Sequence, residues 1–239
     1  MEKIQEHLSR LRLHGMAHRL QELWQTKRNH DLSFMDGLEL LLQAESDERD
    51  NRRFTRLKKS ASFRYQASLE EVACDAKRGL DKSLITDLSS SAYLSKGESI
   101  LITGPTGSGK SYLASALGHQ ACQLGFKVGY YNMQKLFMRS KMYRAEGTIL
   151  RFMERLAKTD LLIIDDFGLT QFDRQQQLDL MEIIEDRHGK KSTIVASQLP
   201  VASWYDVIGE ETIADAILDR LINTSYRIEL KGDSLRKKK

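Results

Sequence analysis

Cysteine is scarce in this chain: only Cys74 and Cys122 occur, far apart in the sequence. Two such thiols cannot form a disulfide scaffold or a cysteine-based zinc site, and this usage is typical of a reducing cytosol. The N-terminal segment MEKIQEHLSR mixes charges and lacks an apolar stretch, so no signal peptide is predicted. No apolar run approaches the roughly 18 residues that a membrane span needs. We therefore expect a cytoplasmic protein without a membrane partner.

Acidic residues are nearly absent from the stretches in which basic residues gather. Residues 49–64 contain seven basic residues and one acid, and residues 127–144 contain five basic residues and no acid. Four more basic residues stand at 236–239. Segregated positive charge favours a polyanionic partner such as DNA, although solvated helix faces and a frayed tail would give the same pattern. The basic residues are Arg49, Arg52, Arg53, Arg56, Lys58, Lys59 and Arg64; Lys127, Lys135, Arg139, Lys141 and Arg144; and Arg236, Lys237, Lys238 and Lys239.

Two domains are predicted from the change in pattern along the chain. Residues 1–75 have leucines at helical spacing, and Ser33 suits the N-cap of a long helix that continues into the first basic segment. We expect a helical domain there that binds DNA or a protein partner. The serines at 89–91 mark a loop. Hydrophobic residues make up 41% of the 239 residues, which is enough for a larger core over residues 76–239.

From about residue 95, predicted strands alternate with predicted helices. This alternation is typical of an α/β fold with a parallel sheet covered by helices on both faces. The strands are predicted at 99–103, 128–131, 161–165, 193–197 and 226–230, and the helices at 110–124, 133–157, 174–187 and 211–222.

Residues 104–111 read GPTGSGKS and match the phosphate-binding pattern G-x-x-x-x-G-K-[ST] in full. The glycines let several backbone N–H groups converge on a phosphate, and the helix that follows adds its positive dipole end. Lys110 can reach the β- and γ-phosphates of ATP, and Ser111 can ligate Mg²⁺. The predicted nucleotide-binding residues are Gly104, Pro105, Thr106, Gly107, Ser108, Gly109, Lys110, Ser111 and Tyr112.

Four apolar residues at 161–164 lead directly into Asp165 and Asp166. A buried strand that ends there would place Asp165 beside Ser111, where its carboxylate can hold Mg²⁺. Asp166 can then activate the attacking water as a general base. Taken alone, the segment could equally be a core strand that runs into an acidic turn. The kinase motif D-F-G also occurs at 166–168, but no kinase catalytic loop precedes it.

The chain resembles the IstB-type AAA+ ATPases, the helper proteins encoded with the transposases of bacterial insertion sequences. It is also similar to the bacterial helicase loader DnaC. The resemblance covers nearly the whole chain and rests on LRLHGMA at 11–17, RGLDK at 78–82, the phosphate-binding loop, LLIIDDFGL at 161–169, SQLP at 197–200 and DRL at 219–221.

This resemblance implies a P-loop AAA+ sheet with a small all-helical N-terminal domain. Only 19 residues follow Arg220, so we expect no C-terminal lid. The resemblance places Gln198 at the first sensor position, where many relatives have Asn. It makes Arg220 an arginine finger that acts on the ATP of a neighbouring subunit. It also implies that the segment after Tyr131 holds a helix that faces DNA. Asp166 stands where many AAA+ proteins have Glu.

The function that follows from the resemblance is a DNA-binding transposition helper with Mg²⁺-dependent ATPase activity. Such a protein would form a homo-oligomer through ATP sites at subunit interfaces and assemble on double-stranded DNA largely regardless of sequence. It would then recruit or activate a transposase. A DnaC-like helicase loader, which binds single-stranded DNA, is the first alternative. A small-molecule P-loop kinase is the second, and the basic segments and the extra strand at 128–131 count against it.

Overall fold

The computed structural model of the chain describes residues 1–26 and 32–235. Their contacts divide into two compact units, Met1–Arg56 and Leu57–Lys239. This division comes earlier than the boundary that we predict after residue 75, because Phe63 and Ala67 contact His119 of the larger unit. The basic tail at 236–239 lies outside the described residues. Among the helices of the described part, none combines the length and apolar character needed to cross a membrane.

The smaller unit is helical, as predicted. Ser33 is confirmed at the start of its long helix, where the backbone N–H of Asp36 donates to its hydroxyl over 3.2 Å. That helix runs without interruption from the smaller unit into the first residues of the larger one. The elements are α1 (Glu2–Arg10), α2 (His14–Gln25) and α3 (Phe34–Ala61).

Gly15 brings the N-terminus of α2 close to α3. A Cβ atom at this position would overlap the backbone oxygen of Ala44 and lie 2.7 Å from Cα of Glu45. The buried Glu45 carboxylate accepts hydrogen bonds from the backbone N–H groups of Gly15, at 2.8 Å, and Met16, at 3.3 Å. A carboxylate at a helix N-terminus is stabilised by the unpaired N–H groups and the helix dipole. Gly15 and Met16, within the 11–17 segment, therefore have a structural role in joining α2 to α3.

The larger unit is built on a parallel sheet of five strands, in the order β2-β3-β4-β1-β5. All four strand pairs are parallel, so the carboxyl ends of the strands meet at one edge of the sheet. The fold class and the position of every strand are thereby confirmed, with small differences at the ends. The strands are β1 (Ser99–Thr103), β2 (Val128–Asn132), β3 (Leu161–Phe167), β4 (Ser192–Ser197) and β5 (Ser225–Glu229).

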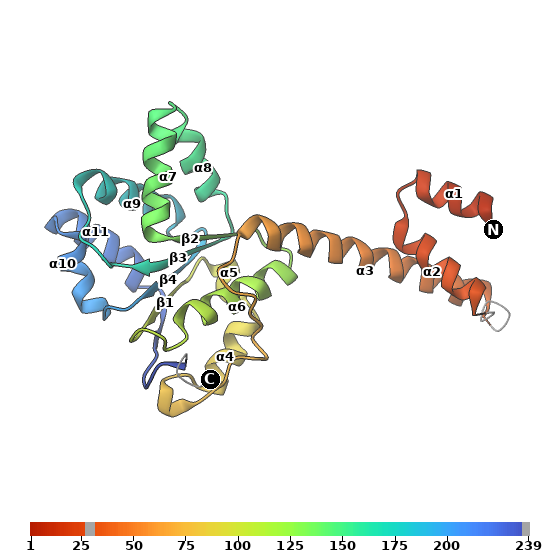
Figure 1. Cartoon of the computed structure of the whole chain (residues 1–239), viewed down its shortest axis with the longest axis horizontal. Coiled ribbons are helices and arrows are strands. Elements are labelled where there is room, and N and C mark those ends of the chain that lie inside the picture. The colour runs from red at the N-terminus through yellow and green to blue at the C-terminus, as the bar shows by residue number, and fades with distance from the viewer. Residues whose placement is uncertain (27–31, 236–239) are drawn as a thin grey trace. The chain divides into compact units, whose positions relative to one another are not determined.

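Helices cover both faces of this sheet (Figure 1). Helix α6 lies on one face, and α7, α9, α10 and α11 lie on the other, where the apolar side chains of β1, β3 and β4 join them in one core. After α11, the described chain contains β5 and residues 230–235 but no further α-helix. The helices are η2 (Ala76–Arg78), α4 (Lys82–Ser89), α5 (Ala92–Lys96), α6 (Lys110–Gln123), α7 (Met133–Ala145), α8 (Ile149–Ala157), α9 (Arg174–Arg187), η3 (Val201–Ser203), α10 (Trp204–Ile208) and α11 (Glu211–Ile222).

The predicted helix over 133–157 is two helices. Gly147 adopts a left-handed conformation with φ of +69°, which ends α7 and lets α8 turn back beside it. The serines at 89–91 end α4 and connect it to α5, as expected. Residues 62–75, which we predict as part of a helical domain, form no helix.

Candidate nucleotide-binding site

The loop at 104–109 joins the end of β1 to the start of α6. Its glycines all have positive φ values, +145° at Gly104, +83° at Gly107 and +104° at Gly109, a conformation that side-chain-bearing residues rarely adopt. Gly109 is the N-cap of α6, so the unpaired N–H groups of that helix open onto the loop. The loop therefore has the backbone that phosphate binding requires.

Lys110 and Ser111 occupy the first turn of α6. The ammonium group of Lys110 donates to the carbonyl oxygens of Gly104, at 2.7 Å, and Pro105, at 2.8 Å, and thus lies within the curve of the loop. The hydroxyl of Ser111 donates to Oδ1 of Asp165 over 3.0 Å. A hydroxyl and a carboxylate are hard oxygen donors, and such a pair fits Mg²⁺. The structure brings these predicted residues together although 54 positions separate Ser111 from Asp165.

Asp165 lies near the carboxyl end of β3, where the sheet register shifts between Ile164 and Phe167. Its side chain is only 1% exposed. Besides Ser111, its carboxylate accepts hydrogen bonds from the backbone N–H of Asp166, at 2.9 Å, and from the Tyr130 hydroxyl, at 2.5 Å. Burial and the neighbouring Asp165 charge both raise the pKa of Tyr130, so that hydroxyl remains a donor. Tyr130 is a supporting residue that the sequence analysis did not identify.

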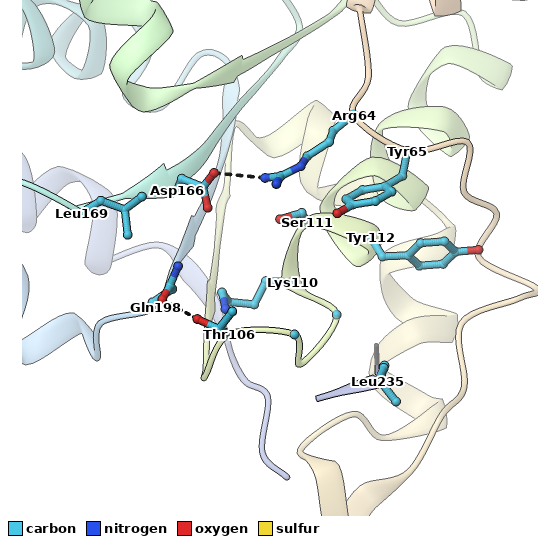
Figure 2. A pocket seen from close by; sticks show the side chains of 12 residues that line it. Arg64, Tyr65, Thr106, Lys110, Ser111, Tyr112, Asp166, Leu169, Gln198 and Leu235 are labelled. Carbon is cyan, nitrogen blue, oxygen red and sulfur yellow. Dashed lines mark hydrogen bonds and ion pairs between the residues drawn. The ribbon is translucent and has the colours of Figure 1, made fainter. Parts of the chain in front are cut away.

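Asp166 follows with a φ of +57°, which turns its carboxylate out of the sheet and into a cavity. Its Oδ2 atom accepts from Asn132 Nδ2 over 2.8 Å and from Arg64 Nη1 over 3.0 Å. Neither partner was predicted for this site. We assigned Arg64 to a basic segment that follows DNA, but the structure places it against Asp166 (Figure 2) and against Asp165. Asn132 could have been noticed as a polar residue at the end of a predicted strand.

The cavity has a volume of about 440 Å³. Gln198, just beyond β4, faces the loop across it and accepts a 2.6 Å hydrogen bond from Thr106 (Figure 2). The lining residues are Arg64, Tyr65, Thr106, Gly107, Gly109, Lys110, Ser111, Tyr112, Asp166, Leu169, Gln198 and Leu235.

A second cavity of about 460 Å³ shares Gly109, Tyr112 and Leu235 with the first. Apolar side chains of the connector and of the segment after β5, among them Val72 and Leu230, form much of its wall. An apolar space beside a phosphate site suits the base of a nucleotide. Tyr112, which we predicted as a nucleotide-binding residue, lines both cavities. Its hydroxyl donates a hydrogen bond to Glu71 over 2.5 Å.

Arg220 lies elsewhere, near the end of α11. Its guanidinium pairs with Glu185 at 2.5 Å and donates to the backbone oxygen of Ala216 at 2.8 Å. It is not among the residues that line the nucleotide cavity of the described chain. The structure therefore does not bring Arg220 to the site of its own chain, which leaves a role in a neighbouring subunit as a prediction.

Several side chains of the predicted basic segments form ion pairs within the chain. Arg49 and Arg52 form ion pairs with Glu45, at 2.7 Å, and Glu48, at 2.5 Å, the alternative that would explain them as helix-surface pairs. In the second segment, Arg144 pairs with the buried Asp179 at 2.6 Å, so it has a structural role.

A concave basic surface lies along β2, α7 and α8. This hollow of about 580 Å³ includes the acid Glu154, which pairs with Lys158 at 3.1 Å. Tyr131 and Tyr143 lie beneath guanidinium groups, with Arg139 5.3 Å from the first ring and Arg155 5.4 Å from the second. The exposed basic residues that line it are Lys127, Arg139, Arg151, Arg155 and Lys158.

Comparison with known proteins agrees with this geometry. The family of IstB-like ATP-binding proteins matches residues 6–239. An insertion-sequence ATP-binding protein of Sinorhizobium fredii is 41% identical over 230 residues, which cover 96% of this chain and 94% of that protein. The ATP-binding protein of insertion sequence IS1162 from Pseudomonas fluorescens is 42% identical over 194 residues, 81% of this chain and 84% of that protein.

Solved structures share the fold. The DnaC helicase loader superposes with a TM-score of 0.59 at 19% identity, over 70% of this chain and 98% of that one. The AMPPCP-bound DnaA of Aquifex aeolicus superposes with a TM-score of 0.61 at 21% identity, over 72% of this chain and 52% of that one. The larger unit accordingly has the AAA+ architecture.

Proposed function

Because this chain belongs to the family of IstB-like ATP-binding proteins, we propose that it is a Mg²⁺-dependent ATPase that assembles on duplex DNA and recruits or activates a transposase. The observation that carries the enzymatic part is the contact of Ser111 with Asp165, which joins the phosphate-binding loop to the acidic strand. The insertion-sequence context of its relatives supports a transposase as the partner.

ATP binds with its phosphates on the N–H groups of the loop and its base in the adjoining apolar cavity. Lys110 neutralises the β- and γ-phosphates, and Ser111 and Asp165 hold Mg²⁺, which offsets the charge that develops on the phosphates. Asp166 accepts the proton of the attacking water. Its Oδ2 atom already has two donors, so Oδ1 is the oxygen that takes the proton. Gln198, held by Thr106, orients that water.

Arg220 completes the site of a neighbouring subunit. Because this arginine comes from a neighbouring subunit, ATP hydrolysis depends on assembly of the oligomer. An isolated subunit lacks the arginine that stabilises the transition state. The proposed homo-oligomer therefore forms through its ATP sites. Arg220 must exchange its Glu185 partner for phosphate when this contact forms.

Duplex DNA lies on the basic hollow along β2, α7 and α8. Five exposed cations border it against a single acid, and this charge binds a phosphate backbone without reading bases. The exposed arginines of residues 49–56 add a second contact from the smaller unit. Sequence preference then belongs to the transposase or to DNA deformability.

The test combines ATP, DNA and a loop variant. Wild-type protein should form discrete assemblies on duplex DNA in electron micrographs when ATP and Mg²⁺ are present. Lys110→Ala should form none, since it removes the charge offered to the phosphates. Equal assembly by Lys110→Ala would contradict ATP-driven binding.

A DnaC-like helicase loader is the second candidate, because DnaC shares the fold of the larger unit. The two functions differ in their DNA. A loader should prefer single strands, whereas the proposed helper should bind a duplex at least as well as a single strand of equal length. A transposase gene beside this one would favour the helper.

A further inference from the structure

Arg64 is shared by the two acidic side chains of the nucleotide cavity. Its Nη1 atom lies 3.0 Å from Oδ2 of Asp166 (Figure 2). The same atom lies 3.3 Å from Oδ2 of Asp165. Asp165 is buried, and a buried carboxylate is costly unless a cation and hydrogen bonds compensate its charge. Arg64 therefore balances charge at the position where the proposed Mg²⁺ would do so.

The backbone around Arg64 is anchored to the larger unit. Ser62 ends α3 with a φ of +57°, and the Phe63 ring then packs edge-on against His119, with 4.3 Å between ring centroids. Gly118 provides the room, because a Cβ atom there would overlap the Phe63 ring. On the other side, the Arg64 guanidinium lies 5.6 Å from the centre of the Tyr65 ring. The Arg64 side chain is thus directed into the cavity by a fixed segment.

The Arg64 guanidinium is partly exposed, so a change of its partner requires no repacking of the core. The Arg64 side chain is 43% exposed, whereas Asp165 is 1% exposed. A guanidinium keeps its positive charge at neutral pH whatever its partner. A charged, half-exposed group on a fixed backbone can exchange partners within one cavity.

We propose that Arg64 is the resident counterion of Asp165 and Asp166, and that it leaves Asp165 when Mg²⁺ binds there. This inference rests on the proposed Mg²⁺ site. Arg64 and Mg²⁺ are alternative cations for one carboxylate, so each lowers the affinity of the site for the other. Before the exchange, Arg64 also shields incoming phosphates from two negative side chains.

Two opposite effects on nucleotide binding follow for Arg64→Gln. Without Mg²⁺, the variant exposes ATP to two uncompensated carboxylates, so its affinity for ATP in EDTA should fall about tenfold, the scale of one charge-assisted hydrogen bond. With Mg²⁺, the competing cation is gone, so half-maximal ATP binding should require about tenfold less Mg²⁺. Calorimetric titration of ATP at a series of Mg²⁺ concentrations measures both effects without any turnover.

Arg64→Lys should restore most of the wild-type Mg²⁺ dependence, because it retains the charge. Arg174→Gln is the matched control: Arg174 is also exposed and pairs with a carboxylate, Glu210 at 3.8 Å, but lies outside the cavity. It should match wild type in both titrations. Thermal unfolding with Mg²⁺ alone gives a second measure, and Mg²⁺ should raise the Tm of Arg64→Gln more than that of wild type.

Three results would overturn the proposal. If Arg64→Gln weakens Mg²⁺·ATP as much as ATP in EDTA, Arg64 binds phosphates instead of replacing Mg²⁺. If neither affinity changes, the ion pairs only hold the segment in place. If wild-type protein binds ATP equally with and without Mg²⁺, the proposed Mg²⁺ site itself is wrong. This last result is recognised from the wild type alone, so it is distinct from a failure of Arg64.

Discussion

Asn132 donates a 2.8 Å hydrogen bond to Asp166 and so ties the end of β2 to the end of β3. The same side chain is the N-cap of α7, where its Oδ1 atom accepts from the backbone N–H of Lys135 over 3.4 Å. The helix that borders the basic hollow thus begins at a residue in contact with the proposed catalytic base. Asp166 and the N-terminus of α7 therefore share one hydrogen-bonding side chain.

Asp166→Asn should bind ATP with nearly wild-type affinity and hydrolyse it at least about 100-fold more slowly. The substitution keeps the size of the side chain and removes the base, whose contribution in enzymes is roughly 10²- to 10⁴-fold. Steady-state phosphate release and ATP calorimetry measure the two quantities. Asp87→Asn, at an exposed position on α4, is the control and should behave as wild type. Undiminished turnover in Asp166→Asn would assign the base to another residue.

Arg220→Ala should bind ATP and lose hydrolysis by roughly 10³-fold or more, as expected for a finger residue. Because the finger acts across a subunit boundary, mixing Arg220→Ala with Lys110→Ala subunits should restore part of the activity. A mixed interface then has an intact loop and an intact finger when the Arg220→Ala subunit supplies the ATP site and the Lys110→Ala subunit supplies the arginine.

Glu185→Gln separates this role from the ion pair within the chain. It breaks the 2.5 Å contact between Glu185 and Arg220 but leaves the arginine in place, so hydrolysis should persist. The finger assignment fails if Arg220→Ala alone hydrolyses ATP normally and the mixture shows no gain.

Binding to unrelated duplexes should weaken uniformly, and depend less on salt, when exposed cations of the basic hollow are removed. Each lost phosphate contact should flatten the log–log salt slope by about 0.9 units. The triple variant to Ala at Arg139, Arg151 and Arg155 should therefore flatten the slope by up to about three units, as measured by fluorescence anisotropy at several salt concentrations.

The same substitution at Arg52, Arg53 and Arg56 should have a smaller effect, because Arg52 already pairs with Glu48. Intact ATPase activity in both variants would show that the nucleotide site is unaffected. An unchanged slope in the hollow variant, with a changed slope in the α3 variant, would move the DNA path to the smaller unit.

Gly15→Ala should destabilise the smaller unit by about 1–3 kcal/mol, since the added methyl group overlaps the backbone of α3. Gly37→Ala is the matched control, because nothing lies within 4 Å of a Cβ atom added there. It should be neutral or stabilising by up to about 1 kcal/mol through helix propensity. Hydrogen exchange of α2 amides measures both effects, and equal protection in the two variants would argue against a close contact at Gly15.

Sequence alone predicted the features that depend on short segments. β1 is predicted at its observed limits because an apolar run ends at a complete phosphate-binding motif. The contact of Ser111 with Asp165 follows from parallel strands whose ends share one edge. The ion pair of Arg64 with Asp166 could not be predicted, because it joins residues 102 positions apart through the packing of Phe63. The count of basic residues grouped Arg64 with its sequence neighbours at 49–64. Its observed partners, Asp165 and Asp166, are determined by tertiary contacts.

The C-terminal segment of the described chain packs against the phosphate-binding loop at Gly107. The backbone N–H of Leu235 donates to the oxygen of Gly107 over 2.9 Å, and a Cβ atom at Gly107 would overlap Ser234. A substitution at Gly107 would therefore have two effects at once. It would change the conformation of the phosphate-binding loop, and it would displace residues 234–235, which pack against that loop. Loss of ATP binding in such a variant would say nothing about which of the two effects was responsible. Because Ser234 and Leu235 contact the loop, an affinity tag at the N-terminus is the safer design for any measurement of nucleotide affinity.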